Sequence, residues 1–198
     1  LWLKRNPLKA EGMFHIGNLM RQNNIIQALD LLNCGLLDNG TKILFDSLKY
    51  NTTLKHLYLS ANGITPVGLQ SILDYYKSGK RNLETLFLGC NRIGCNGAKI
   101  ISEILKYDEN LERLNLASSR IGAEGMKYLT ESLLSHKKLR VLDLGYMRST
   151  IDLGELGNFI EDDGAIYLSN LIKNNQIIIS LSITHNHITQ KGMKLIVE

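Results

Sequence analysis

Residues 86–97 read Leu-Phe-Leu-Gly-Cys-Asn-Arg-Ile-Gly-Cys-Asn-Gly, and this stretch decides the fold. Leu86 and Leu88 are separated by one residue, as in a short strand whose alternate side chains turn inward. Asn91 follows where the chain must turn, and from Gly97 onward the apolar residues have helical spacing. The stretch therefore predicts a strand, a turn and a helix in succession.

The same pattern recurs along the chain with a period of about 28 residues. Its core is Leu-x-Leu-x-x-Asn-x-Leu/Ile-x-x-x-Gly, and seven copies align. The polar slot of the pattern is filled by Asn6, Cys34, Asn62, Asn91, Ser119, Asn158 and Asn186. The intervals between these slots are 28, 28, 29, 28, 39 and 28 residues, so one repeat carries 11 additional residues. The repeats also account for the 35 leucines among the 198 residues.

This pattern closely resembles leucine-rich repeats, and the 28-residue period with a helix in each repeat is similar to the ribonuclease-inhibitor subclass. The resemblance covers essentially the whole chain. It implies an α/β solenoid, a horseshoe of about seven repeats with a parallel β-sheet on its concave face and α-helices on its convex face. Parallel strands need crossover connections, and the helices supply them. We expect the asparagines of the polar slot to pair with backbone groups in the turns.

We expect residues 1–198 to form a single domain that is part of a longer chain. The sequence opens on the strand 1–3 and stops in the helical segment 192–198, with no polar capping unit at either end. The additional residues form an insertion at 147–157, within the sixth repeat. Insertions in repeat proteins lie in loops on one side, often the binding side. A disordered or self-packed loop is the alternative for this segment.

Composition argues against nucleic acid and membrane partners. The net charge is +4, but the basic residues are scattered and form no single stripe. Six lysines are expected near helix C-termini on the convex side, where they offset the helix dipole: Lys49, Lys77, Lys106, Lys137, Lys138 and Lys173. No apolar run reaches the length of a membrane span. The three cysteines favour free thiols, and we therefore expect a cytoplasmic location.

Motifs for catalysis or metal binding are missing from the sequence. Cys90 and Cys95 bracket one Asn turn and His185 and His187 another, without the further ligands that a metal site needs. We expect no cofactor and no enzymatic activity, because no nucleophile, phosphate-binding or zinc-protease motif is present. Two alternatives come from proteins with the same repeats: a GTPase-activating protein of the Ran type, and a ligand-sensing fragment of an innate immune receptor.

The residues between the paired leucines form a column that is expected to face solvent on the concave side. The column reads Trp2, Asp30, Tyr58, Phe87, Asn115, Asp143 and Ser182. Tyr58 and Phe87 lie on neighbouring strands and are expected about 5 Å apart. Exposed aromatic neighbours flanked by charges are typical of a protein-binding hot spot. The alternative is that the two rings only stabilise the sheet.

We therefore expect a protein-protein interaction module that binds a partner protein in its concave face and is a monomer on its own. The resemblance to ribonuclease inhibitor implies a sharper version, in which the chain occludes the active site of a partner enzyme. The richness in Asn, Lys and Ile resembles effectors that intracellular bacterial pathogens secrete into the host cytoplasm. The expected contact residues are Trp2, Asp30, His56, Tyr58, Phe87, Arg113, Asn115, Asp143 and Tyr146 on the concave face, and Arg148, Ile151, Asp152, Leu153 and Glu155 in the insertion.

Overall fold

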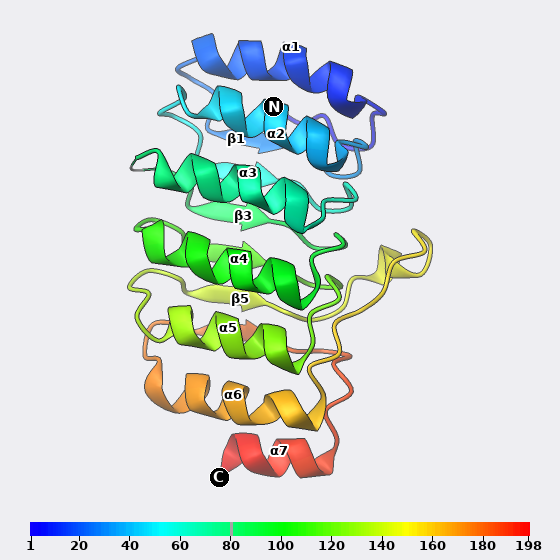
Figure 1. Ribbon diagram of the computed structural model, residues 1–198, viewed down its shortest axis with the longest axis vertical. Coiled ribbons are helices and arrows are strands. Elements are labelled where there is room, and N and C mark those ends of the chain that lie inside the picture. The colour runs from blue at the N-terminus through cyan, green and yellow to red at the C-terminus, as the bar shows by residue number, and fades with distance from the viewer. Residues whose placement is uncertain (80) are drawn as a thin grey trace.

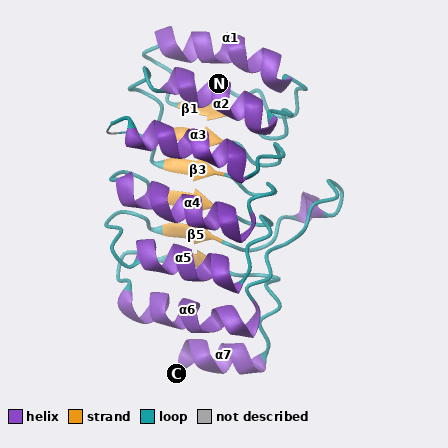
Figure 2. Cartoon of the chain, in the orientation of Figure 1, coloured by secondary structure: helices purple, strands orange, loops and turns teal. Residues whose placement is uncertain are grey.

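A computed structural model describes residues 1–79 and 81–198, in which helices and strands alternate (Figure 1 and Figure 2). The helices are α1 (Lys9–Gln22), α2 (Leu37–Leu48), α3 (Pro66–Lys77), α4 (Gly94–Tyr107), α5 (Ala123–Leu133), α6 (Glu161–Asn174) and α7 (Gln190–Val197). The strands are β1 (Ala28–Asp30), β2 (His56–Tyr58), β3 (Thr85–Phe87), β4 (Arg113–Asn115), β5 (Val141–Asp143) and β6 (Ser180–Ser182). Each predicted repeat contributes a helix to this stack.

The strands form one parallel sheet in the order β1-β2-β3-β4-β5-β6, as predicted. Each strand pairs with the equivalent residue of the next repeat, so Leu57 pairs with Leu29 and with Leu86. The first repeat differs because its strand is reduced to a single bridge between Trp2 and Asp30. The helices stack along one face of the sheet (Figure 1). We call the other face, which corresponds to the predicted concave side, the open sheet face.

The core lies between the sheet and the helices. The paired leucines of the motif, such as Leu57 and Leu59, are fully buried, and each such side chain contributes about 1.5–3 kcal/mol. The recurring glycine allows neighbouring helices to approach. A Cβ at Gly97 would lie 2.5 Å from Cγ2 of Ile93 and 2.9 Å from Cδ1 of Leu69 in the preceding helix. Close packing between repeats therefore explains the glycine slot.

The asparagine slots form a ladder at the carboxyl ends of the strands. Oδ1 of Asn91 accepts hydrogen bonds of 3.0 Å from the backbone N–H groups of Asn62 and Ile64 in the preceding repeat. Its Nδ2 donates to the carbonyl oxygens of Leu59 and Leu88, at 3.0 and 2.8 Å. Asn62, Asn158 and Asn186 bond in the same way. The predicted pairing of these side chains with turn backbone is confirmed.

A second ladder, which the sequence analysis did not identify, lies at the other edge, where each helix returns to the sheet. It comprises Asn23, Asn51, Asp108, His136 and Asn175. Nδ1 of His136 accepts from the backbone N–H of Leu139 at 3.1 Å, which leaves the ring proton on Nε2. Nε2 lies 3.1 Å from Oδ2 of Asp108 and donates to it. Buried side chains thus join successive repeats at both edges.

Candidate functional site

Three aromatic rings form a contiguous row on the open sheet face. The centroids of Trp2 and Tyr58 are 6.1 Å apart with nearly parallel rings, and those of Tyr58 and Phe87 are 5.1 Å apart, edge to face. Trp2 is 67% exposed, while Tyr58 and Phe87 are half-buried. The predicted adjacency of Tyr58 and Phe87 is confirmed. We call Trp2, Tyr58 and Phe87 the aromatic row.

Asp30 does not face solvent as expected, since only 6% of it is exposed. It lies between Trp2 and Tyr58 in the sheet register, and the rings of these two residues stack on each other. Oδ1 of Asp30 accepts a hydrogen bond of 3.0 Å from the backbone N–H of Leu32. The side chain of Asp30 is short and bonds to nearby backbone, so the larger rings of Trp2 and Tyr58 contact each other above it and cover it.

A pocket of about 470 Å³ opens beside the aromatic row. Its lining comprises His56, Tyr58, Glu84, Thr85, Phe87, Glu112 and Arg113. Nδ1 of His56 lies 3.1 Å from Oγ1 of Thr85. Lys55 pairs with Glu84 at 2.8 Å, and this hydrogen bond lowers the pKa of the Glu84 carboxyl. His56 and Arg113, predicted as contact residues, thus border the same hollow as Tyr58 and Phe87.

The polar residues at the other end of the column contact neighbouring side chains within the molecule. Nδ2 of Asn115 donates to Oδ2 of Asp143 at 2.7 Å, and both residues are half-buried. Tyr146 lies against His185, with ring centroids 5.0 Å apart. The open sheet face therefore carries an aromatic end and a hydrogen-bonded polar end.

The insertion is packed at its base onto the turns of two earlier repeats. The carboxylate of Glu155, whose side chain is 8% exposed, bonds Nε of Arg92 at 2.9 Å and Nη2 of Arg120 at 2.6 Å. Oγ1 of Thr150 donates to Oγ of Ser118 at 2.7 Å. The carboxylate of Glu155, one of the predicted contact residues, pairs with two arginines within the molecule.

The tip of the insertion presents apolar side chains to solvent. It begins with a single 3-10 turn, Arg148–Thr150, and projects beside the carboxyl ends of the strands (Figure 1). Ile151 is 78% exposed and Leu156 60%. A hollow of about 600 Å³ separates the insertion from the last turn, and it is lined by Tyr146, Ile151, Gly157, His185 and His187. Arg148, Asp152 and Leu153 are also exposed.

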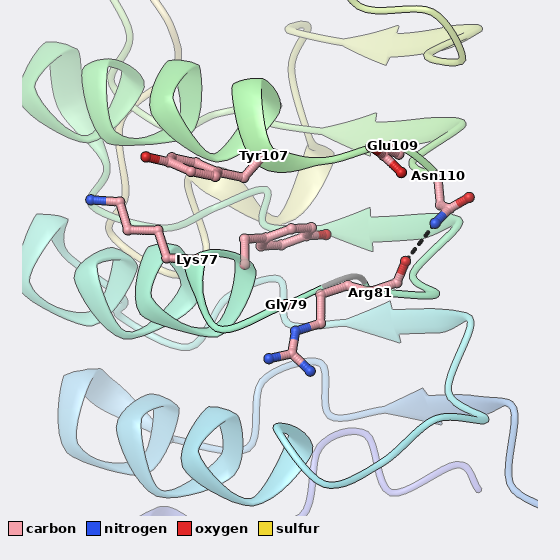
Figure 3. Close-up of a pocket in the computed structure, with 7 residues that line it drawn as sticks. Lys77, Gly79, Arg81, Tyr107, Glu109 and Asn110 are labelled. Atoms are coloured by element: carbon pink, nitrogen blue, oxygen red, sulfur yellow. Dashed lines mark hydrogen bonds between the residues drawn. The ribbon is translucent and has the colours of Figure 1, made fainter.

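A further pocket, of about 230 Å³, lies between the C-terminal ends of α3 and α4 (Figure 3). Nζ of Lys77 lies 5.6 Å from the ring centroid of Tyr107, and Nδ2 of Asn110 donates to the carbonyl oxygen of Arg81 at 2.6 Å. The guanidinium of Arg81 donates to the carbonyl oxygens of Tyr75 and Lys49. These bonds join Arg81 to the preceding and the following repeats.

The structure changes the position of two lysines. Lys137 and Lys138, expected near a helix C-terminus, lie four and five residues beyond the end of α5, in the loop that leads to β5. With Arg140 they line a pocket of about 420 Å³, together with Glu112, Gln176, Ile177 and Ile179. Sequence reasoning missed this pocket. The sequence did contain a signal for it: Glu112, Arg140 and Ile179 occupy equivalent positions of successive repeats, directly before each strand.

The described residues contain neither a cluster of metal ligands nor a membrane-spanning helix. Within residues 1–79 and 81–198, no three His, Cys, Asp or Glu side chains are grouped so that they could hold a metal ion. The thiols of Cys34, Cys90 and Cys95 are free. None of the described helices combines the length and the apolarity needed to cross a bilayer.

Both the sequence and the structure of the chain are similar to those of known proteins. A family model described as "Leucine Rich repeat" matches residues 50–73, 107–129 and 174–197. The mouse protein "NACHT, LRR and PYD domains-containing protein 5" is 31% identical over 93 residues. That match covers 46% of this chain and 8% of the mouse protein, so the chain spans only a small part of that relative's length.

Two solved structures are similar over most of the chain. One is the tropomodulin C-terminal domain of Caenorhabditis elegans, at a TM-score of 0.48 and 10% identity, covering 94% of this chain and 88% of that one. The other, "Leiomodin-1 Actin-Binding Site 2", has a TM-score of 0.47 and 13% identity, covering 94% and 83%. The matched repeats and the alternation of helices with strands in one parallel sheet agree: the chain is folded as a solenoid of leucine-rich repeats.

Proposed function

We propose that this chain binds a partner protein on its open sheet face, with the aromatic row as the main contact. Leucine-rich repeats suggest a protein-protein interaction module, and the single observation that carries the proposal is the contiguous row of three rings on a sheet face without helices. Aromatic side chains combine large contact area with few rotatable bonds, so they dominate the energy of many protein interfaces.

Mutual stabilisation of the sheet is the alternative explanation for these rings. It accounts for the edge-to-face contact of Tyr58 with Phe87. It does not account for Trp2, which is 67% exposed and covers its neighbour on one side only. A tryptophan that is exposed to this extent loses most of its contact with water only when further protein covers it.

The insertion is a second contact region in this proposal. Its base is held by the bonds of Glu155 to Arg92 and Arg120, so Ile151 and Leu156 are presented from a fixed support. An ordered apolar tip loses less conformational entropy on binding than a mobile loop does. The insertion lies at the edge of the sheet where Tyr146 also lies, so one partner can touch both regions.

In its finer form the proposal includes inhibition. If the partner is an enzyme whose active-site rim rests on the aromatic row, the sheet and the insertion would exclude substrate from that site. If the variants lose inhibition together with binding, the inhibitory form of the proposal is supported. If the partner binds without being inhibited, only the general proposal of partner binding is supported.

The experiment begins by identifying the partner at the site. A photo-crosslinking amino acid is placed at position 87 on the open face, or at the exposed convex position 107 as the control. A partner that crosslinks at 87 and not at 107 is then purified, and its affinity is measured by calorimetry.

The Tyr58→Ala/Phe87→Ala double variant should bind this partner at least 100-fold more weakly, because truncation of each hot-spot ring costs about 2 kcal/mol or more. The matched control is Tyr50→Ala/Tyr107→Ala, which removes two exposed rings at the helix C-termini and should retain the affinity. Circular dichroism confirms that both variants are folded. Equal affinities of the two variants would refute the proposal.

A further inference from the structure

Three cations gather around the pocket at the edge of the sheet where the chain enters β5 and β6. Lys137, Lys138 and Arg140 are all exposed, and none has a carboxylate partner in the described part of the chain. Only Lys138 has a polar contact for its ammonium, which donates to Oδ1 of Asn110 at 3.0 Å. Glu112 is the single acidic residue of the lining, so the pocket has an excess of two positive charges.

The backbone fixes the spacing of these side chains. Lys55, Glu84, Glu112, Arg140 and Ile179 form one row, in which the backbone N–H of each later residue donates to the carbonyl oxygen of the one before, at 2.8–2.9 Å. At one end of the row, Lys55 and Glu84 neutralise each other. At the other end, no ion pair joins Glu112 and Arg140 among the described residues. The uncompensated charge is therefore concentrated at the pocket.

Apolar surface lies directly beside these cations. Ile179 is 69% exposed and follows Arg140 in the row, and Ile177 is half-buried in the same lining. Such a surface complements a peptide segment in which carboxylates flank an aliphatic residue, because the carboxylates can pair with the cations while the aliphatic side chain packs against the isoleucines. Neither of these two features depends on the aromatic row.

We propose that this pocket docks an acidic segment of a protein partner, with carboxylates on Lys137, Lys138 and Arg140 and an aliphatic side chain against Ile177 and Ile179. The inference rests on the proposed function only in that the occupant is a protein. A nucleic acid fits less well, because the lining offers no aromatic ring for base stacking and a phosphate backbone has no aliphatic side chain to place against Ile177 and Ile179. An anionic bilayer would need a broader basic surface.

The probes are three fluorescein-labelled peptides of twelve residues. One alternates Glu with Leu, one alternates Gln with Leu, and one alternates Glu with Ser. We expect measurable binding of the Glu/Leu peptide by fluorescence anisotropy at 50 mM NaCl, and at least 10-fold weaker binding of the other two. Raising NaCl to 300 mM should weaken the Glu/Leu complex several-fold, because salt screens exposed charges.

The decisive variant is Lys137→Glu/Arg140→Glu, which should lower the affinity for the Glu/Leu peptide at least 10-fold. The matched control, Lys127→Glu/Lys173→Glu, makes the same change in net charge at exposed positions on α5 and α6 and should leave the affinity unchanged. Ile179→Ser tests the apolar contact and should weaken the Glu/Leu peptide while sparing the Glu/Ser peptide.

Equal affinities of the two charge variants would overturn the proposal, as would tighter binding of a 20-nucleotide single-stranded DNA or of phosphatidylserine vesicles through Lys137 and Arg140. The Tyr58→Ala/Phe87→Ala variant separates this inference from the proposed function. This variant should bind the Glu/Leu peptide with unchanged affinity. Peptide docking at the pocket would therefore stand even if the aromatic row proved not to contact a partner.

Discussion

Replacement of Asn91 by alanine measures how much a single rung of the asparagine ladder stabilises the solenoid. Asn91 is fully buried and forms four hydrogen bonds. The two carbonyl groups retain other donors after the change, since Leu59 O accepts from Asn62 Nδ2 and Leu88 O from Oγ of Ser119. The backbone N–H groups of Asn62 and Ile64 lose their acceptor.

The expected cost follows from those two donors. An unsatisfied buried donor costs about 1–3 kcal/mol, so Asn91→Ala should lower the free energy of unfolding by about 4 kcal/mol. At about 2–4 °C per kcal/mol for a chain of this size, the Tm should fall by roughly 8–16 °C. Urea titration followed by circular dichroism gives the free energy, and a thermal melt gives the Tm.

Two other slots of the ladder serve as controls. Asn6 makes one exposed side-chain bond, to Leu3 O at 3.0 Å, so Asn6→Ala should cost less than about 1 kcal/mol. At the fifth slot, Ser119 donates its hydroxyl proton, and the N–H groups of Asn91 and Ile93 have no acceptor within the described residues. Ser119→Asn supplies one and should stabilise the chain by about 1 kcal/mol. A cost for Asn91→Ala as small as that for Asn6→Ala would refute the reasoning.

Two further predictions concern the insertion and the alkaline limit. Glu155→Gln removes the negative charge that Arg92 and Arg120 share, so amide hydrogen exchange should become faster at residues 150–156 and trypsin should cut faster after Arg148, while the Tm changes little. Asp152→Asn changes an exposed carboxylate of the same insertion and is the control. Unchanged exchange in Glu155→Gln would contradict the conclusion that Glu155 holds the base of the insertion. Burial raises the pKa of Tyr75 to about 12, whereas its pKa in the unfolded chain is about 10. Ionisation of Tyr75 therefore leaves the free energy of unfolding unaffected below pH 10 and lowers it as the pH rises toward 12. Absorbance at 295 nm should show a tyrosine signal that ionises near pH 12 and is lost in Tyr75→Phe, and an unchanged titration curve in that variant contradicts the raised pKa.

The sequence was sufficient to predict the repeat, the parallel sheet and the first ladder. These features depend on interactions between equivalent residues of neighbouring repeats, so a period of 28 determines both spacing and partner. Tyr58 and Phe87 illustrate this, because their one-repeat separation already predicted rings about 5 Å apart, and the centroids lie at 5.1 Å.

Features that combine non-equivalent positions could not be read from the period. Glu155 meets Arg92 and Arg120 only because the insertion folds back over two repeats, and no spacing encodes that path. Asp30 illustrates a second limit: alternation predicts the face of a strand, but the size of the neighbouring side chains decides whether a short residue is covered. Lys137 and Lys138 lie in the loop after α5 because that helix ends at Leu133, a boundary that the period does not determine.

The direction of the asparagine ladder has a consequence for synthesis on the ribosome. Oδ1 of Asn62 accepts from the turn of the preceding repeat, and Asn91 and Asn158 do the same for the turns before them. A turn therefore acquires its acceptor only after the following repeat has been translated. Folding should trail elongation by about one repeat, and a pause in translation would leave the newest turn open to water until its successor emerges.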